Sequence, residues 1–145
     1  MPGPGTWSPG DVLTAADLNA IGTWTSYTPT LTQSVARTAT VNYAEYVQIN
    51  KMVIANVDLT CTTTGTLANI RVSPPINFPS TYVTDLTLVG SGIFFDSSAT
   101  TTSVLGVVAS ATSYVEFRAD NSTALLNTTL GNGDVISFSI VYEVA

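Results

Sequence analysis

The feature that most limits the folds open to this 145-residue chain is a two-residue alternation of apolar and polar side chains. In an extended chain, successive side chains point to opposite faces, so such a stretch predicts a strand with one buried face. Two stretches show the pattern most clearly. Their apolar members are Val53, Ala55, Val57, Leu59 and Cys61 in the first, and Ile136, Phe138, Ile140, Tyr142 and Val144 in the second. The regularity of the second stretch predicts that it is paired inside a sheet.

Shorter stretches predict further strands at 43–49, 68–72, 86–95, 104–109 and 114–119. In the first of these, Tyr43, Val47 and Ile49 share one face with Glu45, which indicates a half-buried strand. Asn50-Lys51 fits a two-residue hairpin loop. Further turn signals lie at 62–65, 110–113 and 131–134.

Prolines and glycines refine this interpretation. Three prolines in 73–80 exclude a central strand there, which leaves an edge or a loop. Gly90 and Gly92 lie within an apolar strand, where glycine indicates a bulge or a close approach of two backbones. Seven or eight strands joined by turns predict an all-β, antiparallel β-sandwich for residues 29–145, and we favour a jelly roll.

The N-terminal region differs from the rest of the chain. Residues 1–10 contain three prolines and three glycines and predict an irregular arm. Trp7 is a large apolar side chain in this arm, and it must pack either on the chain's own domain or on a partner. Trp24 and Tyr27 follow among threonines before Pro29 ends the extended run.

A short helix is predicted between the two tryptophans, in the sequence LTAADLNAIG. Thr14 can cap its N-terminus, with Asp17 as the carboxylate of a capping box. Leu13 and Leu18 fit the hydrophobic staple around that cap. An isolated helix shorter than about 12–15 residues is marginal in water, so the side formed by Leu13, Leu18 and Ile21 must dock onto this chain or onto another protein.

The amino-acid composition of the chain argues against most catalytic and ligand-binding functions. The chain has no histidine and one cysteine, which excludes a Ser-His-Asp or Cys-His site, an intramolecular disulfide and a cysteine-rich metal site. The carboxylates are scattered, so we expect no enzyme and no cofactor. Oxygen-rich turns at 120–121 and 132–134 could hold Ca²⁺, but ordinary turn chemistry explains them better, so we expect no metal.

Four basic residues and a net charge of −6 disfavour binding to nucleic acid. No run approaches the ~18 apolar residues of a membrane span, and we find no signal-peptide pattern, so we expect synthesis in the cytoplasm. Thr, Ser and Asn occupy positions where a monomer would carry Lys and Glu. This composition fits a protein whose sides are covered by copies of itself or by a larger assembly, and it fits a neutral Thr-rich β domain equally well.

The segment GDVLTAADLNAIGTWTSYTPTLT resembles the N-terminal part of many small bacteriophage virion proteins: minor tail proteins, tail or head fibres and capsid decorations. Their pattern is a Gly, then LTAxxLN, and soon afterwards W-x-x-Y-x-P. The matching residues here are Gly10, Leu13, Thr14, Ala15, Leu18, Asn19, Trp24, Tyr27 and Pro29. The sequence YVQINKMVIANVDLT is similar to their first hairpin, with Asn50 in place of the usual Gly. The similarity covers about the first 60 residues.

The resemblance implies an N-terminal virion anchor, residues 1–28, joined to an outward-facing β domain that is usually trimeric. We therefore expect a homotrimer in the virion, assembled in the bacterial cytoplasm and held to other phage proteins by apolar anchors. These anchors are Trp7, Leu13, Leu18, Ile21 and Trp24. We further expect Tyr43, Tyr46, Tyr114 and the Thr-rich loops at 62–66 and 97–102 to be exposed or to lie between subunits.

Three functions remain. The leading one is a tail fibre or minor tail protein, with head decoration as its close alternative. The second is a carbohydrate-binding module for host attachment, because exposed Tyr and Trp rings can stack on the sugars of a host-surface glycan. The third is a lectin-like monomer unrelated to phage.

Overall fold

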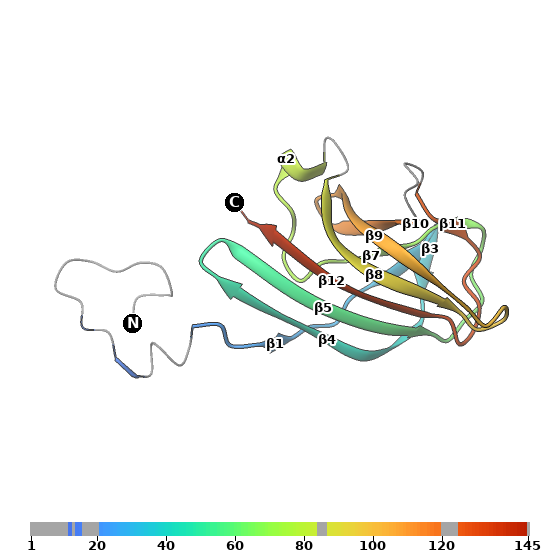
Figure 1. Ribbon diagram of the computed structural model, residues 1–145, viewed down its shortest axis with the longest axis horizontal. Helices are drawn as coiled ribbons and strands as arrows, with labels where there is room; N and C mark the ends of the chain where they lie inside the picture. The colour runs from blue at the N-terminus through green and yellow to red at the C-terminus, as the bar shows by residue number, and fades with distance from the viewer. Residues whose placement is uncertain (1–11, 13, 16–20, 84–86, 120–124, 145) are drawn as a thin grey trace.

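The computed structural model describes residues 12, 14–15, 21–83, 87–119 and 125–144. It confirms an all-β, antiparallel, sandwich-like fold (Figure 1). The strands are β1 (Thr25–Ser26), β2 (Leu31–Gln33), β3 (Val35–Arg37), β4 (Ala39–Ile49), β5 (Met52–Cys61), β6 (Ala68–Asn69), β7 (Arg71–Val72), β8 (Leu88–Asp96), β9 (Thr101–Ala111), β10 (Tyr114–Ala119), β11 (Asn127–Thr128) and β12 (Val135–Glu143), and a short helix α2 spans Ser80–Val83.

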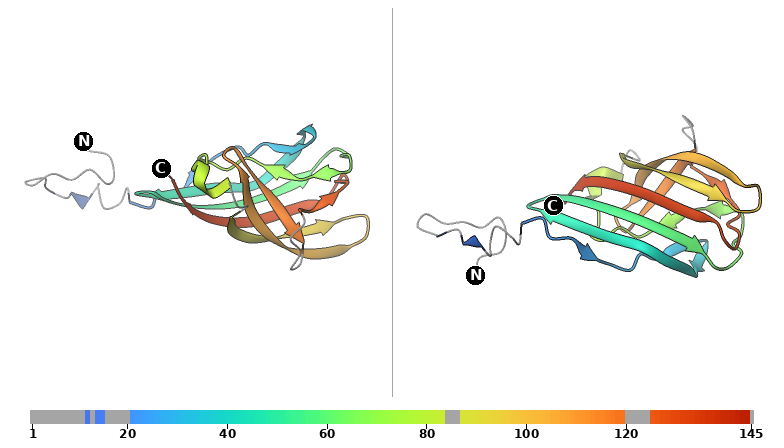
Figure 2. Two further views of the ribbon diagram at one scale, coloured as in Figure 1. Left: turned by 90° about the horizontal axis from the view of Figure 1, so that it is seen from above. Right: turned by 60° about the horizontal axis from the view of Figure 1, so that its bottom comes forward.

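Ten of these strands form one sheet in the order β1-β4-β5-β12-β8-β9-β10-β7-β2-β3, and β11 pairs with β6 in a small second sheet. The large sheet curls back on itself, so that its two halves form the layers of the sandwich (Figure 2). One curled sheet thus takes the place of the two separate sheets of a jelly roll. The last strand, β12, lies between β5 and β8, which confirms that it is paired inside the sheet.

The core lies between the two layers and is built by the predicted alternation. The five apolar residues of each of the two clearest stretches are all buried. Phe117 of β10 and Phe138 of β12 meet across the core with their ring centroids 5.3 Å apart. Complete burial of a large apolar side chain contributes about 1.5–3 kcal/mol, so these two stretches contribute substantially to stability.

Strand β4 shows where the alternation is interrupted. Its pairing with β5 shifts in register between Val41 and Tyr43, as at a β-bulge. Beyond the bulge, Ala44 and Tyr46 lie opposite the buried Val57 and Ala55 of β5, on the core side of the sheet. The face that carries Tyr43, Glu45, Val47 and Ile49 is therefore the outer one.

The glycines of β8 confirm the two features predicted for them, a bulge and a close approach of two backbones. The pairing of β8 with β9 shifts between Leu88 and Gly90. A Cβ atom at Gly90 would collide with the carbonyl oxygen of Ser139, and one at Gly92 with that of Ser137 on β12. The backbones of β8 and β12 therefore approach each other as closely as only glycine permits.

Two local predictions need correction. The stretch 68–72 was expected to be one strand, but β6 belongs to the small sheet and β7 to the large one. Residues 73–79 form a loop, as the prolines predict, but the unexpected helix α2 follows it. α2 contacts β9.

Candidate functional site

The structure describes three of the residues predicted for the N-terminal anchor: Thr14, Ile21 and Trp24. Thr14 is exposed and directly precedes Ala15, whose backbone is α-helical. Ile21 and Trp24 are 46% and 45% exposed. Trp7, Leu13, Asp17 and Leu18 lie outside the described residues. In the single chain, Ile21 and Trp24 therefore each keep nearly half of their surface in contact with solvent.

The anchor segment joins the sandwich through β1. Thr25 pairs with Tyr46 of β4, and the amide of Tyr27 donates a 3.1 Å hydrogen bond to the carbonyl oxygen of Ala44. The rings of Tyr27 and Tyr46 meet edge to face at 5.9 Å. Burial raises the pKa of the Tyr27 hydroxyl. The residues from Thr25 onward are thus part of the sandwich, and the segment that can reach a partner ends near Trp24.

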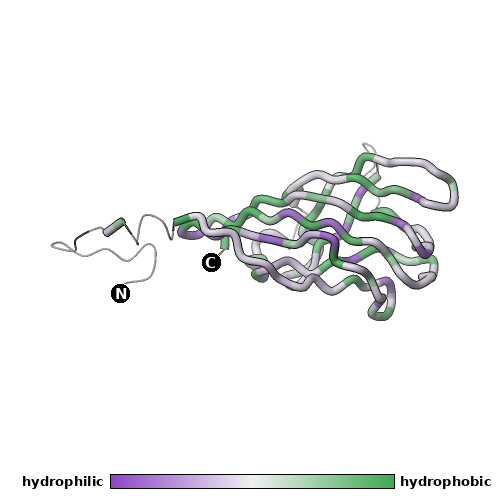
Figure 3. Tube along the Cα trace, turned by 90° about the horizontal axis from the view of Figure 1, so that it is seen from below, coloured by the Kyte–Doolittle hydropathy of each residue, from purple (hydrophilic) through white to green (hydrophobic). Residues whose placement is uncertain are grey.

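The outer side of the layer formed by β4, β5, β12, β8 and the adjoining β9 is called the front face below. Its outward-facing residues are Tyr43, Glu45, Val47, Ile49, Met52, Ile54, Asn56, Asp58, Ile93, Val104, Ser137, Ser139, Val141 and Glu143. Hydrophilic and hydrophobic stretches are interspersed along the strands of the sandwich (Figure 3).

Several apolar residues of the front face are exposed. Val104 is 62% exposed and Val141 51%, and four others exceed a third: Ile49, Met52, Ile93 and Tyr43. The charged members of the front face are all acidic: Glu45, Asp58 and Glu143. A shallow hollow of about 400 Å³ lies between β12, β8 and β9 and is lined by small and apolar residues such as Ser137, Ser139 and Val104. The front face therefore combines exposed apolar area with a shallow depression.

The three predicted tyrosines lie in three different environments. Tyr43 is on the front face, where its hydroxyl donates a 3.0 Å hydrogen bond to Glu45, which raises the pKa of Tyr43. Tyr46 packs against the core from the inner side of the sheet. Tyr114 lies on β10 beneath the guanidinium of Arg71, 4.5 Å from its ring centroid. They do not form one surface.

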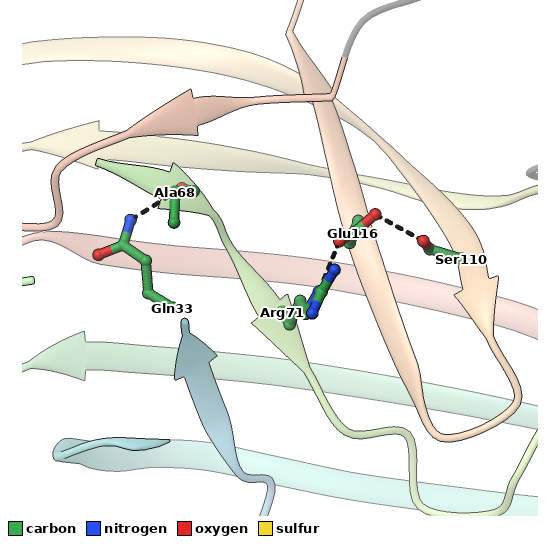
Figure 4. A network of polar contacts seen from close by, with 5 residues as sticks. All are labelled: Gln33, Ala68, Arg71, Ser110 and Glu116. Atoms are coloured by element: carbon green, nitrogen blue, oxygen red, sulfur yellow. Dashed lines mark hydrogen bonds and ion pairs between the residues drawn. The ribbon is translucent and has the colours of Figure 1, made fainter. Parts of the chain in front are cut away.

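The opposite layer contains an ion pair, between Arg71 and a buried Glu116, that was not predicted from the sequence. Glu116 of β10 is 1% exposed and accepts a 2.6 Å hydrogen bond from Nε of Arg71 and a 2.5 Å hydrogen bond from the hydroxyl of Ser110 (Figure 4). The carboxylate of Glu116 raises the pKa of the Arg71 guanidinium. Arg71 and Glu116 are cross-strand partners in the β7–β10 pair, which brings together residues 45 positions apart in the sequence.

A small polar pocket of about 270 Å³ adjoins Arg71, between the β2–β3 turn and the small sheet. Its other lining residues are Ser34, Leu67, Ala68, Asn69 and Asn127. Asn69 and Asn127 are directly opposite each other in the β6–β11 pair. The residues that line this pocket therefore include two asparagines and a serine together with Arg71.

Gln33 holds the small sheet to the large one (Figure 4). Its side chain is fully buried. The amide nitrogen donates to the carbonyl oxygens of Ala68, at 3.0 Å, and Thr128, and the amide oxygen accepts from the backbone of Thr66 at 3.1 Å. Gln33 thus satisfies backbone groups of both small-sheet strands.

The described part of the chain was compared with the requirements of a metal site and of a membrane-spanning helix. Within it, no three His, Cys, Asp or Glu side chains are placed to hold a metal ion. None of its helices has the length and apolar composition needed to cross a membrane. Comparison of the chain with protein-family models, curated proteins and solved structures found no match.

Proposed function

We propose that this chain is a non-catalytic structural component of a bacteriophage particle, a tail fibre or minor tail protein. It attaches to the particle through its N-terminal segment and presents its sandwich outward. The observation that carries the proposal is the exposure of Ile21 and Trp24 at the end of a segment beside a sandwich whose core is complete without them. Tryptophan is enriched among the residues that contribute most of the binding energy of protein interfaces. The LTAxxLN sequence that precedes them supports a virion partner.

The sandwich is proposed to be a homotrimer that associates through the front face. Exposed Val104, Ile93 and Val141 would lose water contact when a second copy covers them. The small side chains of Ser137 and Ser139 allow a neighbouring backbone to approach the shallow hollow between them. A closed ring of three copies would cover this face in every subunit.

A head decoration protein is the second candidate, because the same exposed segment would serve on a capsid as well as on a tail. Immunoelectron microscopy of purified particles separates the two. With antibodies raised against the sandwich, we expect label on the tail. Label confined to the capsid would establish the second candidate instead. Absence of the protein from purified particles, by mass spectrometry, would contradict both.

A further inference from the structure

We propose that Arg71, Asn69 and Asn127 form a binding site for a saccharide unit that carries a carboxylate. This site lies on the layer opposite the front face and does not depend on the attachment role of the N-terminal segment.

The guanidinium of Arg71 is fixed in position, but it still has hydrogen-bond donors available for a ligand. Its Nε donates to the buried Glu116 at 2.6 Å, and the ring of Tyr114 lies under its plane at 4.5 Å. Its side chain is nevertheless 39% exposed. Among the described residues, no hydrogen-bond acceptor contacts its two Nη atoms. A guanidinium fixed at one edge can still receive a carboxylate at the other edge in a bidentate fashion.

The amides of Asn69 and Asn127 supply the hydroxyl-binding groups. The two residues face each other across β6 and β11, and both line the pocket that Arg71 adjoins. In the described part of the chain, neither side-chain amide has a hydrogen-bond partner. Each amide can donate to one hydroxyl and accept from another, which is the pairing that a sugar ring needs. Leu67, 72% exposed, offers apolar contact to the C–H face of such a ring.

Charge and size restrict the class of ligand. Glu116 offsets the charge of Arg71, and the whole chain carries −6, so polyanions such as nucleic acid are disfavoured. One carboxylate with neighbouring hydroxyls matches one guanidinium with neighbouring amides. The pocket volume of about 270 Å³ is just below the ~300–1,000 Å³ typical of pockets for drug-sized ligands, which suits a single sugar ring.

The test uses the full-length protein, with glucuronate as the probe and NMR titration of the Asn side-chain amides as the readout. We expect saturable shifts of the Asn69 and Asn127 signals. Methyl glucoside, which lacks the carboxylate, and acetate, which lacks the ring, should each bind about tenfold more weakly, as expected when one charge-assisted contact is lost. No saturable shift at these amides with glucuronate, or equally tight binding of inorganic phosphate, would overturn the proposal.

Two variants make the test specific to the site. Arg71→Lys keeps a cation beside Glu116, so the fold is retained, but it removes the bidentate edge. Asn127→Ala removes one amide. Each should weaken glucuronate binding about tenfold. Arg118→Lys, on the same strand as Glu116, is the matched control and should leave the affinity unchanged. The proposal fails if Arg71→Lys binds as tightly as the wild type while its thermal unfolding is unaltered.

Discussion

Gln33 is the residue whose truncation we expect to be most costly outside the apolar core. Gln33→Ala would leave the carbonyl oxygens of Ala68 and Thr128 and the amide of Thr66 without their buried partner. Buried backbone groups left unsatisfied cost about 1–3 kcal/mol each, so we predict a loss of about 3 kcal/mol in the free energy of unfolding. Urea unfolding followed by circular dichroism measures the change.

Gln48 provides the matched control for that substitution. It lies on β4, is exposed, and makes one side-chain hydrogen bond, of 2.9 Å, to the carbonyl oxygen of Asn50. Gln48→Ala should change the free energy of unfolding by less than about 0.5 kcal/mol. Equal effects of the two substitutions would show that Gln33 does not hold the small sheet in place.

Because of Cys61, we expect the free energy of unfolding to depend on pH in the alkaline range. Burial raises the pKa of its thiol from the ordinary 9.0 to about 11. Well below pH 9 the thiol is neutral in both states, and its contribution to stability is fully present. Between pH 9 and 11 the unfolded chain releases this proton while the folded protein keeps it, so stability falls as the pH rises, by about 2 kcal/mol for this group.

The comparison of wild type with Cys61→Ala isolates this effect. Tyr27 and Tyr142 also titrate at high pH, but they are common to both proteins. Urea unfolding under reducing conditions should show the stability difference between the two proteins shrinking from pH 8 to pH 11. A difference that does not change with pH would mean that Cys61 titrates normally in the folded state.

At the scale of elements, β5 and β12 could be predicted from sequence because their alternation is unbroken and their burial depends only on position within the strand. The core face of β4 required knowledge of the bulge near Asn42, whose side chain bonds Asp58 and Thr60 on the outer face. The division between β6 and β7 depends on Gln33, which contacts residues 35 to 95 positions away. The Arg71–Glu116 pair likewise depends on strand register, which local sequence does not specify.

The junction of the anchor with the sandwich leads to a prediction about truncation. Removal of residues 1–21 leaves β1 and Tyr27 in place, so the truncated protein should unfold at nearly the wild-type temperature. Removal of residues 1–28 also deletes β1 and the Tyr27–Tyr46 contact and should cost about 3 kcal/mol, similar to truncation of a buried aromatic side chain. Differential scanning calorimetry compares the two. Equal stability of the two truncated proteins would contradict the role of β1.

For the whole molecule, the proposed trimer predicts a mass in solution of three times the 15.2 kDa chain mass, measured by light scattering after size exclusion. Val104→Lys places a charge on the front face and should yield monomers. Leu67→Lys is the matched control and should leave the trimer intact. Leu67 is as exposed as Val104, at 72% compared with 62%, but it lies beside the polar pocket of the opposite layer. A wild-type monomer, or a trimer that survives Val104→Lys, would rule out association through the front face.

The incorporation of the truncated chain into phage particles tests attachment most directly. Particles assembled with the full-length protein or with the protein lacking residues 1–21 are purified, and the copies per particle are counted by quantitative mass spectrometry. We predict that the full-length chain is present and that the truncated chain, although folded and soluble, is absent. Particles that contain both forms in equal amounts would show that the N-terminal segment is not the anchor.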